Sequence, residues 1–160
     1  YGSLNYGSLN YGSLNYGSGN YGSSEGGRAG GGSSDRGSLG RVLLVEDEPA
    51  LRMLVERTLR KHGYDVVAAG DVPQARRLWH SEPAFDMVLS DIVLPGEETG
   101  IDLVQSLRAK HPALKVLFMT GYTAEMDKPN FSERVGAPVL GKPFDIASLL
   151  ASVAAVMGAR

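Results

Sequence analysis

Five short apolar runs, each followed by a longer segment with apolar residues at helical spacing, occupy the chain between residues 41 and 157. The runs span residues 42–45, 66–69, 85–89, 116–119 and 139–140. A short apolar run bounded by polar residues is typical of a strand that is buried on both faces. Strands that alternate with helices form one parallel sheet with helices on both sides. The sequence therefore predicts an α/β fold with a doubly wound, five-stranded parallel sheet.

The segments that follow these runs carry their apolar residues on one helical face. The first of them places Leu51, Leu54, Val55 and Leu59 three or four residues apart, which matches the period of an α-helix. The segment at residues 124–134 is different, because it contains a proline and an asparagine and shows no apolar stripe. Proline interrupts a helix by removing a hydrogen-bond donor. We expect a short, broken or mobile helix there.

Residues 1–40 have a different composition. They contain 13 of the 21 glycines and repeat the pentapeptide YGSLN with small variations, before a Gly/Ser-rich linker. Their leucines recur every five residues, which matches neither a helix nor a strand. We expect a low-complexity, disordered tail at 1–40 and a globular domain at 41–157. The alternative for the tail is self-association through stacked tyrosines, since it carries no charge before Glu25.

Composition excludes several classes of function. The chain has no cysteine, which rules out disulfides and thiolate metal sites and is compatible with the cytoplasm. A net charge of -2 gives no general attraction to nucleic acid, so direct binding to nucleic acid is not expected. The apolar runs are far shorter than the roughly 18 residues of a membrane span, so membrane insertion is not expected. The chain starts at Tyr1 with no signal-peptide pattern, which suggests a trimmed or fused protein.

Polar residues follow four of the predicted strands. In a doubly wound sheet, ligands bind outside the carboxyl ends of the strands. The residues found there are the acidic pair Glu46-Asp47, Asp91, Thr120 and Lys142. Each of these residue types alone is common at strand ends, where it caps a helix or lies in solvent. Together, and in this order, they indicate a functional site.

Three carboxylates at one edge of a sheet repel one another unless a cation joins them. Oxygen ligands without a nearby histidine or cysteine favour Mg²⁺ or Mn²⁺ over zinc. Asp91 is then placed as a nucleophile that accepts a phosphoryl group. Lys142 contributes a positive charge and Thr120 a hydroxyl group to the phosphoryl oxygens.

The chain resembles a receiver domain of two-component signalling systems over residues 41–157. The resemblance lies in the motifs VLLVEDEP, VLSDIVLPG, LFMTGY and LGKPFD. It implies a flavodoxin-like sheet with strand order 2-1-3-4-5. It also implies site residues by position, namely Glu46 and Asp47 for Mg²⁺ binding, Asp91 as phospho-acceptor, Thr120 as the switch hydroxyl, Lys142 as the phosphate-binding lysine, and the backbone carbonyl of Val93 as a further metal ligand.

The function implied by the resemblance is signalling and not enzymatic turnover. A histidine kinase or a histidine phosphotransfer protein is the expected partner, and the domain promotes its own phosphorylation and slow dephosphorylation. The loop LPGEETG and the C-terminal segment look most like receivers of hybrid histidine kinases, although a stand-alone receiver is equally compatible. A weak homodimer is a further association to consider.

One position departs from the family pattern. Receivers usually carry a tyrosine or phenylalanine three residues before the lysine, which turns inward when the switch hydroxyl moves to the phosphate. Here that residue is Val139. A valine cannot make this rotation, so we expect a switch that operates through the loop after Thr120 and the fourth helix, or one that is muted.

Three alternative functions share parts of this residue pattern. A haloacid-dehalogenase-type phosphatase needs a second aspartate two residues after the nucleophile, where this chain has Val93. A dinucleotide-binding protein needs a glycine-rich loop after the first strand, where the chain reads EDEPAL. The remaining alternative is a receiver-like interaction module that binds its partner without phosphate.

Overall fold

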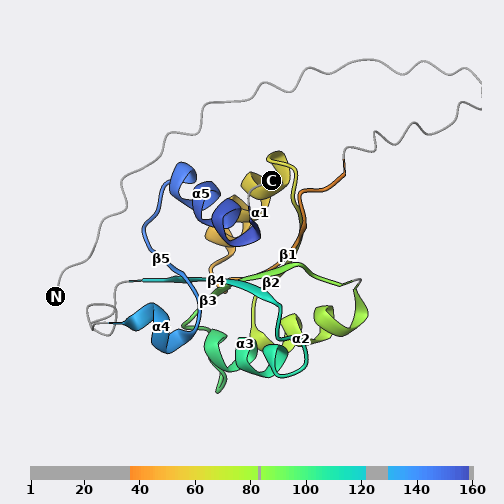
Figure 1. Ribbon diagram of the computed structural model, residues 1–160, viewed down its shortest axis with the longest axis vertical. Coiled ribbons are helices and arrows are strands. Elements are labelled where there is room, and N and C mark those ends of the chain that lie inside the picture. Colours follow the sequence, from red (N-terminus) through yellow and green to blue (C-terminus); the bar gives the residue numbers. More distant parts are fainter. Residues whose placement is uncertain (1–36, 83, 122–129, 159–160) are drawn as a thin grey trace, which may run out of the picture. The chain divides into compact units, whose positions relative to one another are not determined.

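The computed structural model describes residues 37–82, 84–121 and 130–158. Within them, five strands alternate with five helices, as the apolar runs predict (Figure 1). In chain order these are β1 (Arg41–Val45), α1 (Pro49–Lys61), β2 (Asp65–Ala69), α2 (Val72–Ser81), β3 (Met87–Asp91), α3 (Gly100–Arg108), β4 (Lys115–Thr120), α4 (Phe131–Val135), β5 (Val139–Gly141) and α5 (Ile146–Met157).

The strands form one parallel sheet with the order β2-β1-β3-β4-β5. This confirms the predicted flavodoxin-like topology. Because all five strands run in the same direction, their carboxyl ends lie at one edge of the sheet. None of the helices in the described part of the chain has the length and apolar character needed to span a lipid bilayer.

Two apolar clusters pack against the two faces of the sheet. Helices α1 and α5 cover one face, where Val55, Leu59, Leu149 and Val153 meet side chains of β1, β3 and β4. Helices α2 and α3 cover the other face with a second cluster, and Figure 1 shows the two layers above and below the sheet. The central strands are therefore buried on both sides, which explains why they read as continuous apolar runs.

The start of the third strand differs from the prediction. The apolar run begins at Phe85, but β3 begins at Met87 and extends to Asp91. Phe85 is buried before the strand, with its ring stacked against Trp79 at 5.6 Å between centroids. A run of apolar letters cannot distinguish a strand residue from a core residue that precedes the strand.

The fourth helix is short in the described residues, where it covers Phe131–Val135. It follows Asn130, which has a φ of 66°, a left-handed conformation that asparagine tolerates better than most residues. Residues 122–129, which hold the proline of the predicted interruption, lie outside the described residues. The tail at residues 1–36 also lies outside them, and the predicted boundary at residue 40 stays a prediction.

Side-chain caps fix where the helices at the functional edge begin. Thr99 and Asp102 form a reciprocal capping box at the start of α3. Asp145 caps α5 by accepting a hydrogen bond from the backbone of Ser148 at 2.7 Å. Such caps satisfy backbone N–H groups that have no partner within the helix, and they hold the adjoining loops in place.

Candidate functional site

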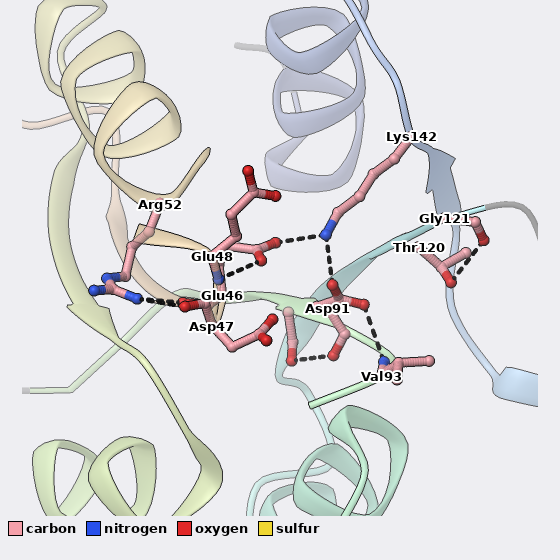
Figure 2. A network of polar contacts seen from close by, with 10 residues as sticks. Glu46, Asp47, Glu48, Arg52, Asp91, Val93, Thr120, Gly121 and Lys142 are labelled. Atoms are coloured by element: carbon pink, nitrogen blue, oxygen red, sulfur yellow. Dashed lines mark hydrogen bonds and ion pairs between the residues drawn. The ribbon is translucent and has the colours of Figure 1, made fainter. Parts of the chain in front are cut away.

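The strand-end residues singled out by sequence lie together at the carboxyl edge of the sheet. Asp91 and Thr120 are the last residues of β3 and β4, Glu46 follows β1, and Lys142 follows β5. The strand order places β3 between β1 and β4. Asp91 therefore occupies the centre of the group, as Figure 2 shows.

Three carboxylates converge at this edge. Glu46, Asp47 and Asp91 each offer one oxygen, and these oxygens lie within 4.8 Å of one another. Glu46 is fully buried and Asp91 is 6% exposed, whereas Asp47 is exposed. An all-oxygen donor set with one face open to solvent suits a hydrated hard cation. The side chains present therefore fit Mg²⁺ or Mn²⁺, in agreement with the predicted metal.

Lys142 reaches two of these carboxylates across the sheet. Its Nζ donates hydrogen bonds to Glu46 Oε2 at 2.7 Å and to Asp91 Oδ2 at 2.5 Å. Burial works against the charged ammonium, but the hydrogen bonds that it donates to both carboxylates, and their charges, outweigh burial, so the pKa of Lys142 is raised. Burial also raises the pKa of Glu46, and the contacts with Lys142 and with the backbone of Glu48 only partly oppose this. The site thus holds one cation among three carboxyl groups and keeps an excess of negative charge.

Both carboxylate oxygens of Asp91 are held in place. Oδ1 accepts a hydrogen bond from the backbone N–H of Val93 at 2.9 Å, and Oδ2 accepts the one from Lys142. The hydroxyl of Ser90 donates to the Asp91 backbone carbonyl at 2.8 Å. The backbone of Val93 therefore lies at the site, while the predicted role of its carbonyl as a metal ligand stays a prediction.

Thr120 is buried at the end of β4. Its hydroxyl donates to the carbonyl of Gly121 at 3.1 Å, and its own carbonyl accepts from the backbone N–H of Lys142 at 2.7 Å. Figure 2 shows Thr120 beside Asp91 with the hydroxyl on Gly121. The hydroxyl contacts the neighbouring backbone here, and the predicted role of Thr120 as the switch residue stays a prediction. Lys142 is followed by Pro143 through a cis peptide bond.

Sequence reasoning missed two residues that shape the site. Arg52 donates hydrogen bonds to the backbone carbonyls of Glu46 and Asp47. Gly100, the first residue of α3, lies so close to Asp91 that a Cβ atom would stand 1.9 Å from the Asp91 carbonyl oxygen. An arginine on the polar side of a helix and a glycine at a helix start are ordinary patterns, so neither carries a clear sequence signal.

With this geometry established, comparison with known proteins gives the family. The response regulator receiver domain family matches residues 42–154, which is most of the globular region. The chain belongs to this family of two-component signalling domains.

Two of the relatives show that the similarity extends over a single domain. The response regulator protein PilR of Pseudomonas aeruginosa is 37% identical over 124 residues, covering 77% of this chain and 27% of PilR. The response regulator receiver protein CpdR of Brucella abortus is 36% identical over 110 residues, covering 69% of this chain and 90% of CpdR. The chain thus spans about a quarter of PilR but nearly the whole of CpdR.

Two further similarities concern the fold and the hybrid-kinase resemblance. The structure of the chemotaxis response regulator CheY4 of Vibrio cholerae matches with a TM-score of 0.63 at 31% identity, over 72% of this chain and 97% of CheY4. The sensor kinase CckA of Brucella abortus is 36% identical over 113 residues, covering 70% of this chain and 12% of CckA. Receivers within kinases and receivers of response regulators are therefore both among the relatives.

Proposed function

We propose that Asp91 accepts a phosphoryl group from a phosphorylated histidine, in a Mg²⁺-dependent reaction, and that the domain relays this signal by a change of conformation. The observation that carries the proposal is the position of the Asp91 carboxylate. This carboxylate accepts a hydrogen bond from the Lys142 ammonium at 2.5 Å. With Glu46 and Asp47 it also forms an acidic cluster whose oxygens lie within 4.8 Å of one another. This combination supplies a nucleophile, a positive charge and a set of ligands for a divalent cation.

The residues divide the work of the transfer. An oxygen of Asp91 attacks phosphorus, the bond from phosphorus to the histidine nitrogen breaks, and the nitrogen keeps the electron pair. The Lys142 ammonium already donates a hydrogen bond to Asp91. As the phosphoryl group transfers, it can form the same kind of contact with the phosphoryl oxygens and stabilise their negative charge. Val93 N–H holds the other Asp91 oxygen, which orients the carboxylate. Glu46, Asp47 and Asp91 would hold Mg²⁺, and the bound ion would neutralise part of the phosphoryl charge.

The relay begins with Thr120 in this proposal. Its hydroxyl bonds the carbonyl of Gly121 at 3.1 Å, a weak contact that a phosphoryl oxygen can replace. Rotation of the hydroxyl toward Asp91 releases the Gly121 carbonyl. Phosphorylation thereby changes the backbone contacts at the carboxyl end of β4.

The proposed donor is a histidine kinase or a histidine phosphotransfer protein, and the reaction implies a cytoplasmic location. The similarity to the sensor kinase CckA supports a receiver from a hybrid kinase, and the similarity to CpdR supports a stand-alone one. The domain is a signalling module whose aspartyl phosphate is lost slowly, and not an enzyme that turns over a substrate.

The test uses the whole chain with Mg²⁺ and a small phosphodonor. Acetyl phosphate is expected to add one phosphoryl group by mass spectrometry, and beryllofluoride is expected to shift the amide resonances near Asp91. Asp91→Asn, which keeps the size of the side chain but not the nucleophile, is expected to show neither response. A wild-type protein without either response would support the phosphate-independent interaction module instead.

A further inference from the structure

We propose that Arg52 is a positioning residue for the metal-binding acidic pair, holding Glu46 and Asp47 through their backbone so that their carboxylates face Asp91. The inference rests on the proposed function, because it concerns affinity for the divalent cation. Arg52 lies in the first turn of α1, where its backbone N–H donates to the Glu48 carbonyl at 2.9 Å. Its side chain turns back over the loop between β1 and α1 (Figure 2).

The Arg52 guanidinium group donates its hydrogen bonds to backbone carbonyls and not to carboxylates. One of its nitrogens donates to the Glu46 carbonyl at 2.7 Å and to the Asp47 carbonyl at 3.3 Å. The carboxylates of both residues lie on the Asp91 side, where they form the acidic cluster. Lys142, in contrast, occupies an oxygen of Glu46 and an oxygen of Asp91. Arg52 can therefore order the ligands without competing with the cation for their oxygens.

The loop held by Arg52 needs this support. Glu48 is the N-cap residue of α1, but its side chain makes no capping hydrogen bond. Asp47 is exposed, so packing does not fix its direction. A side chain anchored on the rigid helix α1 and bonded to two successive carbonyls fixes the peptide planes on either side of Asp47. Because the side chain is attached to this backbone, fixing the two peptide planes restricts the positions that the Asp47 carboxylate oxygens can reach.

Gly70 supplies an independent observation. A Cβ atom at this position would lie 3.2 Å from the terminal nitrogen of Arg52, closer than ordinary van der Waals contact. Gly70 does not adopt the positive φ found at Gly40, Gly63 or Gly96, so its backbone does not demand a glycine. The missing side chain instead leaves room for the Arg52 guanidinium beside the end of β2.

Repulsion within the acidic site is a second reason for the loop to need support. The site contains three carboxyl groups and one ammonium, so its negative charges repel one another when no metal is bound. The hydrogen bonds from Arg52 to the Glu46 and Asp47 carbonyls hold the loop in the conformation that brings both carboxylates together with Asp91. Removing a side chain that orients metal ligands without binding the metal itself typically weakens metal binding by about 10-fold to 100-fold.

The first experiment measures Mg²⁺ binding to the full chain by isothermal titration calorimetry. Arg52→Met keeps the bulk of the side chain and removes its donors and charge, and it is expected to weaken Mg²⁺ binding about 10-fold. Arg52→Lys keeps the charge and some donors and is expected to recover part of the affinity. Arg57→Met, at an exposed arginine of the same helix, is the matched control and is expected to bind Mg²⁺ like the wild type.

A double-mutant cycle separates positioning from a general effect on stability. Gly70→Ala is expected to displace the guanidinium and weaken Mg²⁺ binding in the wild-type background, but to add little in the Arg52→Met background. Equal effects of Gly70→Ala in both backgrounds would overturn the inference. The melting temperature in EDTA identifies any variant that fails to fold, and Arg52→Lys and Gly70→Ala then still test the proposal.

The outcomes distinguish the two proposals. A wild-type chain that shows no Mg²⁺ binding and no response to beryllofluoride contradicts the proposed function. If the wild-type chain binds Mg²⁺ and the Arg52→Met variant binds it with equal affinity, only the proposed role of Arg52 is contradicted. Loss of Mg²⁺ affinity in Arg52→Met and its partial return in Arg52→Lys support both.

Discussion

Lys142 and Asp91 are joined by a hydrogen bond of 2.5 Å between residues 51 positions apart in the chain. Lys142 also bonds Glu46 at 2.7 Å, so one ammonium links the ends of β1 and β3 to the segment after β5. Among the described residues, Lys142 is the cation that forms ion pairs with the buried carboxylates of Glu46 and Asp91 when no metal is bound. The side chain that neutralises the metal-free site is therefore the same one that is proposed to act in phosphoryl transfer.

Replacing Lys142 with methionine is expected to lower the free energy of unfolding of the metal-free protein by about 2 kcal/mol. Breaking a fully buried ion pair costs about 3–5 kcal/mol, and the partial exposure of Lys142 reduces this figure. Mg²⁺ is expected to restore part of the loss by neutralising the same carboxylates. Urea denaturation with and without Mg²⁺ measures both effects, with Lys61→Met as the exposed control. A variant as stable as the wild type in EDTA would contradict the prediction.

The protonation of Glu46 gives a prediction on pH. Burial raises the pKa of Glu46 above its ordinary value of 4.5, so the folded protein binds this proton more tightly than the unfolded chain does. The contribution of Glu46 to stability is therefore greatest at low pH and falls as the pH rises from 4.5 through the raised pKa. In EDTA, the free energy of unfolding of the wild type is expected to fall relative to Glu46→Gln over this range. A relative gain for the wild type would refute the assignment.

Gly100→Ala tests the close approach of α3 to Asp91. The added Cβ would lie 1.9 Å from the Asp91 carbonyl oxygen and 2.8 Å from the Ser90 hydroxyl. Relief of this clash must move either the helix or the acceptor, at an expected cost of about 1–3 kcal/mol, and the amide shifts induced by beryllofluoride are expected to shrink. Gly121→Ala is the control for stability, because no atom of the described residues lies within 4 Å of its added Cβ. Equal stability of the two variants would show that α3 accommodates the methyl group.

Val139 is the position that tests how the signal is read out. It is half-buried at the start of β5, paired in register with Phe118, and packs against the apolar cluster on the α2 and α3 side of the sheet. Val139→Tyr is expected to enlarge the beryllofluoride-induced amide shifts along β4 and β5, while Val139→Ile leaves them as in the wild type. NMR titration of both variants provides the comparison. If the shifts in Val139→Tyr matched those of the wild type, the side chain at this position would not limit the switch.

Most of the fold could be predicted because a doubly wound sheet buries its strands on both faces. The runs at β1 and β4 are apolar at every inward position, and the strand-end rule then places Glu46, Asp91, Thr120 and Lys142 at one edge. The start of β3 could not be predicted. Phe85 has the same apolar character as a strand residue, and only its stacking on Trp79 distinguishes it.

The supporting residues of the site could not be predicted for a related reason. The contact of Arg52 with two carbonyls depends on the direction of a long side chain and on the space beside Gly70, which are properties of the folded chain. The role of Gly100 depends on how closely α3 approaches β3. Residue type and spacing describe single elements, whereas these contacts arise between elements.

The separation of Glu46 and Lys142 by 96 residues has a consequence for biosynthesis. A ribosome delivers the acidic pair and Asp91 well before it delivers Lys142, so the emerging chain holds its carboxylates without their cation. The site becomes complete only when β5 pairs with β4 and brings Lys142 to the carboxylates. A chain that ends before β5 would therefore carry Asp91 and Glu46 without the ammonium that bonds to both.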